Sequence, residues 1–97
     1  MKLEQILEKL TAITEGLFYD EIEFSYDAMG FTMAFSHPAE LLGDMCAELS
    51  TMIEYDTADP EELSIILSGL KEMRFSFDLV VLNESIEMLE SYISEIE

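Results

Sequence analysis

The stretch FYDEIEFSYDAMGFTMAFS, residues 18–36, decides the fold class that the sequence predicts. Its apolar residues recur at every second position before and after residues 27–30, which is typical of two half-buried β-strands. The turn between them ends at Gly30, a residue that can take a positive φ. A four-residue loop places the apolar side chains of both strands on one face. The sequence therefore predicts an antiparallel hairpin.

The segments that flank this hairpin predict helices. Before it, apolar residues recur at helical spacing from Leu3 to Glu15, and Gly16 stands where a left-handed cap would be. After it, a second helix is predicted to begin at Pro38 and to run to about Tyr55.

Two further helices are predicted in the second half of the chain. Asp59 caps the first of them, Pro60 takes its first position, and Glu62 can close a capping box. Residues 73–82 alternate as a third strand would, but apolar residues then step by three and four to the end of the chain. We favour a helix from Asp78 to Glu97 over a third strand.

Together these segments predict a single α+β domain over residues 1–97, in the order α-β-β-α-α-α. A chain of 97 residues is long enough for one modest core. The two-stranded antiparallel hairpin is expected to pack against the helices, because a lone hairpin is not stable in water.

The chain is strongly acidic, with 22 Asp and Glu against 4 Lys and Arg and a net charge of -18. Residues 10–70 contain no lysine or arginine. Because 49% of the residues are hydrophobic, we expect a folded domain rather than an acidic tail. Such an excess of charge costs stability by self-repulsion and attracts positively charged surfaces. The predicted partner is therefore a basic protein surface, with direct binding to nucleic acid or to an anionic membrane excluded.

Cysteine usage and the start of the chain bear on location. Cys46 is the one cysteine, so an internal disulfide is excluded, and its position on an apolar helical face predicts a buried thiol. The first ten residues mix Lys and Glu with apolar residues and lack the apolar run of a signal peptide or membrane span. We expect a protein of the cytoplasm of a bacterial host.

Carboxylates recur at regular intervals on three predicted elements. The steps are about 6.6 to 6.8 Å along the first strand, and about 6 Å on the second helix and about 4.5 Å on the last. A strand of duplex DNA carries a negative charge about every 3.4 Å of axis. Met29, at the hairpin tip, could anchor a partner through an apolar contact. The predicted partner-binding residues are Asp20, Glu21, Glu23, Asp27, Met29, Glu40, Asp44, Glu48, Glu84, Glu87 and Glu90.

The hairpin, the second helix and the last helix carry no lysine that would compensate these charges. In size, charge and carboxylate layout the chain resembles the small acidic DNA-mimic proteins that phages and mobile elements use against restriction and CRISPR enzymes. This resemblance implies a non-enzymatic inhibitor. Such an anti-CRISPR or anti-restriction protein presents a rigid acidic surface to the nucleic-acid-binding site of a nuclease or host-defence protein.

Other interpretations of the acidity remain open. Glutamates on the outer face of a helix are often only solvated, and a halophilic or acidic proteome would also produce them. A toxin-neutralising immunity protein presents acids to a basic enzyme without following the spacing of DNA. An oligomerising adaptor would use the heptad of the last helix to form a homodimer.

No catalytic residue, cofactor or metal site is predicted. His37 precedes a proline at a helix start, where a capping or surface role is expected. The carboxylates at Asp56, Asp59, Glu61 and Glu62 lack the alternating ligands and central glycine of an EF-hand.

Overall fold

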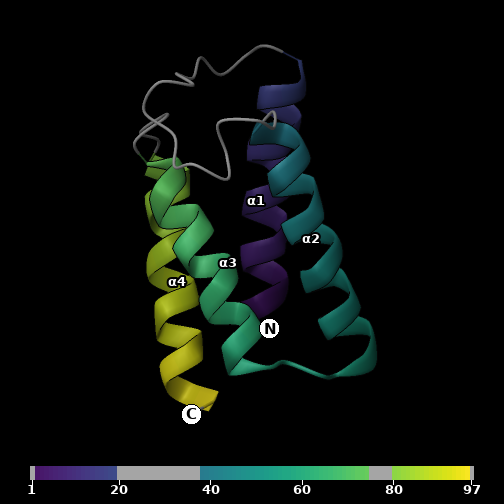
Figure 1. The fold of residues 1–97 in the computed structure, drawn as a ribbon, viewed down its shortest axis with the longest axis vertical. Helices are drawn as coiled ribbons and strands as arrows, with labels where there is room; N and C mark the ends of the chain where they lie inside the picture. The colour runs from purple at the N-terminus through teal and green to yellow at the C-terminus, as the bar shows by residue number, and fades with distance from the viewer. Residues whose placement is uncertain (1, 20–37, 75–79, 97) are drawn as a thin grey trace.

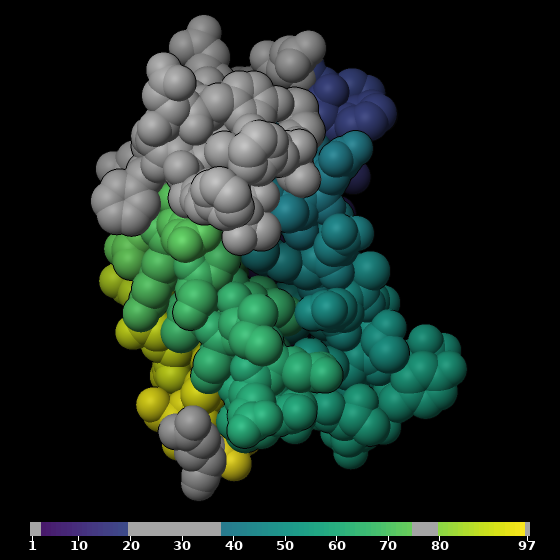
Figure 2. Space-filling view, in the orientation of Figure 1, coloured from purple at the N-terminus to yellow at the C-terminus, as the bar shows by residue number. Residues whose placement is uncertain are grey.

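The computed structural model describes residues 2–19, 38–74 and 80–96. The helices in these ranges are α1 (Lys2–Phe18), α2 (Pro38–Tyr55), α3 (Pro60–Met73) and α4 (Val80–Ile96). They run alternately up and down, so each is antiparallel to the next (Figure 1). Helix α1 packs against both α2 and α4, and α3 packs against α4. Figure 2 shows α2 and α3 together on one face of the molecule.

The fold is all-α, and the predicted α+β class is wrong. Helix accounts for 92% of the described residues, and none of them lies in a strand. The four helices bury their apolar stripes against one another, so the described core needs no sheet as a packing partner. Of the predicted hairpin, residues 20–36 lie outside the described residues.

Helix α1 continues past the point where the sequence predicts its end. Gly16 lies buried inside the helix, and none of the described glycines has a positive φ, so the predicted left-handed cap at Gly16 is wrong. Leu17 is fully buried and extends the stripe of Leu10 and Ile13 by one turn. Phe18, predicted as the first strand residue, is the last residue of α1.

The core is built from the apolar stripes that the sequence predicts. Most of the predicted stripe residues are buried. Five others are partly buried and pack against the core: Leu7, Leu41, Met45, Ile53 and Leu67. The helical spacing of these residues is therefore confirmed. The buried apolar residues are Leu3, Ile6, Leu10, Ile13, Leu17, Ala39, Leu42, Leu49, Met52, Leu63, Ile66, Leu70, Met73, Leu82, Ile86, Leu89, Tyr92 and Ile93.

The connection between α2 and α3 closes both helix ends with hydrogen bonds. Asp56 has a φ of 51°, and the Thr57 N–H donates to the Met52 carbonyl at 3.0 Å, which is the Schellman arrangement. Asp59 then adopts an extended backbone, and its side chain accepts a hydrogen bond from the Glu61 N–H at 3.0 Å. The predicted start of α3 is confirmed.

The last helix begins at Val80, which confirms a helix for the described part of the segment predicted from Asp78 to Glu97. Met73 is also helical, so the strand alternative for residues 73–82 fails at both of its ends, while residues 75–79 lie outside the described residues. The heptad positions from Leu82 to Ile93 are buried within this chain. A second copy could pair with this seam only if the helix first left its own core.

The surface of the described residues is acidic throughout. Every Asp and Glu among them is exposed, whichever helix carries it. Within the same residues, no helix combines the length and the apolar character needed to cross a membrane.

Candidate functional site

The described structure contains part of the predicted partner-binding surface. The residues on the first predicted strand and at the hairpin tip fall outside it: Asp20, Glu21, Glu23, Asp27 and Met29. The structure places the other six on helices α2 and α4, and all six are exposed.

Helix α2 carries an uncompensated row of charge. We call Glu40, Asp44 and Glu48 the α2 acidic row; they are exposed on one side of a helix that contains no basic residue. None of the three side chains forms an ion pair or hydrogen bond with a described residue. The opposite side of α2 is fixed in the core by Leu42 and Leu49, both fully buried. The row is therefore presented on a rigid element.

Helix α4 carries the second row, Glu84, Glu87 and Glu90, which we call the α4 acidic row. Lys9 Nζ of α1 lies 2.9 Å from Glu84 Oε2, and Lys71 Nζ of α3 lies 3.2 Å from Glu90 Oε1. The prediction that this row is uncompensated is therefore wrong at two of its three positions. The missing cations come from neighbouring helices, which a search for lysine four residues along the same helix cannot find.

The two rows do not form one surface. Helix α1 packs against α2 on one side and α4 on the other, so α2 and α4 stand at opposite corners of the bundle (Figure 1). A partner that contacts one face of the bundle would therefore meet one of these rows and not the other. Each row is thus a separate candidate surface.

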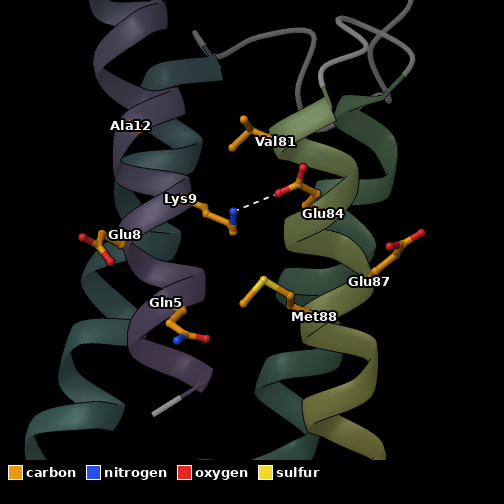
Figure 3. Close-up of a pocket in the computed structure, with 8 residues that line it drawn as sticks. All are labelled: Gln5, Glu8, Lys9, Ala12, Val81, Glu84, Glu87 and Met88. Carbon is orange, nitrogen blue, oxygen red and sulfur yellow. Dashed lines mark hydrogen bonds and ion pairs between the residues drawn. The ribbon is translucent and has the colours of Figure 1, made fainter.

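A hollow lies between α1 and α4. This α1–α4 groove has a volume of about 800 Å³, and Figure 3 shows its lining side chains from both helices. Ala12 and Val81 stand toward one end, Gln5 and Met88 toward the other, and the Lys9–Glu84 ion pair crosses between them. The lining residues are Gln5, Glu8, Lys9, Ala12, Val81, Glu84, Glu87 and Met88.

The α1–α4 groove combines an apolar floor with acidic edges. Met88 and Val81 point toward α1, whereas Glu8 and Glu87 point outward from the two sides (Figure 3). Met88 packs against the buried core, and Val81 is 38% exposed. The groove can therefore take an apolar ligand group between two carboxylates.

The sequence does not predict most of the residues that line this groove. Glu84 and Glu87 are predicted partner-binding residues, but the contributions of α1 are not predicted. The local signal is the spacing of Gln5, Lys9 and Ala12 along one side of α1, beside its core stripe. That α1 lies next to α4 is a long-range fact that this spacing does not contain.

Two smaller hollows adjoin the α2 acidic row. One, of about 230 Å³, places Glu40 near the exposed rings of Phe18 and Tyr19, whose centroids are 5.1 Å apart. The other, of about 340 Å³, lies between α2 and α3 and includes Glu48 and Glu62. The α2 acidic row therefore borders both hollows.

The described residues contain no group of three or more His, Cys, Asp or Glu side chains placed to hold a metal ion. His37 lies outside these residues. Cys46 is half-buried rather than fully buried, and its Sγ lies 4.0 Å and 3.9 Å from the hydroxyls of Thr11 and Thr14. Cys46 is predicted to be buried, and the structure shows it only partly buried.

No protein-family model, curated protein or solved structure matches this chain.

Proposed function

We propose that this protein is a non-enzymatic inhibitor that presents the α2 acidic row to the basic, nucleic-acid-binding site of a nuclease or host-defence protein. In this proposal Glu40, Asp44 and Glu48 take the places of phosphates. The partner is a protein, and the contact excludes the nucleic acid that the partner would otherwise bind.

One observation carries the proposal: three exposed carboxylates recur every four residues on a helix that has no basic residue. Each step along the row is about 6 Å, from a rise of about 1.5 Å per residue. Like charges at this spacing are mildly destabilising. An arrangement that weakens folding and lacks cationic partners among the described residues supports a role in binding.

A toxin-neutralising immunity protein is the second candidate. The α1–α4 groove favours it, because an apolar floor between carboxylates has no counterpart in a phosphate backbone. Such a protein would use acids and apolar contacts together against one cognate enzyme. Displacement by DNA separates the two candidates, since a mimic competes with duplex DNA for its target.

The test compares two triple variants of equal charge. One replaces the α2 acidic row (Glu40→Gln, Asp44→Asn, Glu48→Gln) and the other the α4 acidic row (Glu84→Gln, Glu87→Gln, Glu90→Gln). Each changes the net charge from -18 to -15, since three negative charges are removed. The wild type and both variants are immobilised, exposed to a nuclease-treated bacterial lysate, and eluted with duplex DNA.

We expect the wild type and the α4 variant to retain DNA-binding proteins that duplex DNA releases, and the α2 variant to lose them. Circular-dichroism melting of all three proteins controls for folding. An empty eluate, retention that duplex DNA does not reverse, or equal losses in both variants would contradict the proposal. Equal losses would show that net charge, and not the α2 acidic row, attracts the partner.

A further inference from the structure

We propose that the α1–α4 groove is a second docking surface, and that its occupant is a cationic amphipathic helix of a partner protein. This inference does not depend on the function proposed for the α2 acidic row, which lies on a different helix. It concerns the apolar and charged groups that α1 and α4 place on either side of one hollow.

The dimensions of the groove fit a short helix. Its α1 wall extends from Gln5 to Ala12 and its α4 wall from Val81 to Met88, and Ala12 stands opposite Val81 (Figure 3). Each wall spans seven steps, or about 10 Å at about 1.5 Å per residue. About two turns of a third helix can therefore lie along the walls, in the way that amphipathic helices fill grooves between helices.

The floor of the groove specifies apolar side chains at the centre of that helix. Ala12 leaves space between the walls, because its side chain is short and exposed. Met88 adds a flexible thioether that adapts to the shape of a partner side chain. Apolar residues spaced three and four apart on the incoming helix would meet Ala12, Val81 and Met88.

The edges of the groove specify basic residues on both flanks of the helix. Glu8 on α1 and Glu87 on α4 point away from the floor on opposite sides, and neither pairs with a described cation. Lys9 is the one basic lining residue, and Glu84 already neutralises it at 2.9 Å. The charge left at the two edges is negative, which complements lysine or arginine and repels an acidic helix.

Lys9 limits how strongly the groove attracts a basic helix. Its ammonium lies in the middle of the groove and pairs with Glu84, so this carboxylate is not available to the ligand. Apolar contact with the floor must then supply the rest of the affinity. Removing the Lys9 charge should therefore strengthen binding of a basic helix.

The probe is a fluorescein-labelled peptide of about 14 residues, or about four helical turns, with leucine on one face and lysine on the other. Binding is followed by fluorescence anisotropy at about 0.15 M salt, where the screening length is about 8 Å. A peptide of the same composition, scrambled so that it has no apolar face, tests the contribution of the floor. We expect the scrambled peptide to bind about tenfold more weakly.

Three pairs of variants locate the site, each with the same chemical change inside and outside the groove. Ala12→Gln fills the groove and should abolish binding, whereas Ala47→Gln on α2 should leave it unchanged. Glu8→Gln with Glu87→Gln should weaken binding about three- to tenfold, and Glu61→Gln with Glu72→Gln on α3 should not.

The third pair concerns the two lysines that pair with α4. Lys9→Gln should tighten binding, while Lys71→Gln removes an equivalent ion pair outside the groove and should not. The α2 triple variant should bind the peptide like the wild type, which keeps a failure of this inference distinct from a failure of the proposed function. Equal effects of both members in every pair, or equal binding of the scrambled peptide, would overturn the inference.

Discussion

Lys9 Nζ lies 2.9 Å from Glu84 Oε2 across the α1–α4 groove, although the two residues are 75 positions apart in the chain. The pair joins the first helix to the last at the surface of the bundle. It also places one of the few cations of this chain within a groove that is otherwise edged by carboxylates. Lys9 thus links the two helices and reduces the negative charge of the groove between them.

The Lys9–Glu84 pair should contribute little to the free energy of unfolding. Its side chains are 33% and 48% exposed, and exposed pairs typically contribute about 0.2–1 kcal/mol. A double-mutant cycle with Lys9→Gln and Glu84→Gln, measured by urea unfolding, isolates this coupling from the change in net charge. We expect the coupling to shrink as salt rises. A coupling well above this range would show that the pair organises the α1–α4 interface.

Salt should stabilise the whole domain even as it weakens that pair. The net charge is -18, and every described carboxylate is exposed, so self-repulsion dominates the surface electrostatics. Raising NaCl from about 0.01 M to about 0.1 M shortens the screening length from about 30 Å to about 10 Å. We expect the Tm to rise in this range, and to rise less for the α2 triple variant. A Tm that falls with salt would show that attractive pairs outweigh the repulsion.

At position 56, glycine should give a more stable fold than alanine. Its φ of 51° is in the left-handed region, which glycine adopts without the steric cost of a Cβ. Asp56→Gly and Asp56→Ala remove the same charge, but only the first removes the Cβ. We expect the glycine variant to be more stable than the alanine variant by about 1 kcal/mol in chemical unfolding. Equal stabilities would indicate that the Schellman turn rearranges around alanine.

Gly43 and Gly69 should respond differently to alanine. A Cβ at Gly43 meets nothing within 4 Å, so Gly43→Ala should stabilise α2 by about 0.8–1.0 kcal/mol through helix propensity. A Cβ at Gly69 would lie 2.5 Å from Met45 Cε. Moving the Met45 side chain should therefore offset part of the stability that alanine adds to α3.

The comparison is completed in a Met45→Ala background, with unfolding free energies measured for all combinations. Gly69→Ala should gain more there than in the wild type, because the methyl group that it would meet is gone. Identical gains in both backgrounds would show that Met45 moves aside without cost.

Near the end of α1, two predictions made from the sequence are wrong for local physical reasons. At Gly16 a glycine with the right position for a cap lies inside α1 instead, because burial of Leu17 continues the helix. At Phe18 the period-two spacing starts within a helix, so the apolar spacing alone does not separate the end of a helix from the start of a strand. The α+β prediction is wrong for a separate reason, because the described helices bury their apolar stripes against one another without a sheet.

The candidate site was predictable only in part. The exposure of the α2 acidic row follows from its position opposite a stripe of leucines, and the sequence predicts it. The compensation of Glu84 by Lys9 and of Glu90 by Lys71 depends on which helices become neighbours. The same is true of the groove that joins Ala12 to Val81.

The sequence by itself determined the helices that begin at Pro38 and Pro60, most of the last helix, and the side of each that is buried. It could do so because apolar spacing and helix caps act between residues a few positions apart. Only the tertiary structure decided that the two acidic rows stand at opposite corners and that α1 and α4 enclose a groove. Those relationships arise from the packing of whole helices, where side chains distant in sequence must fill one core together.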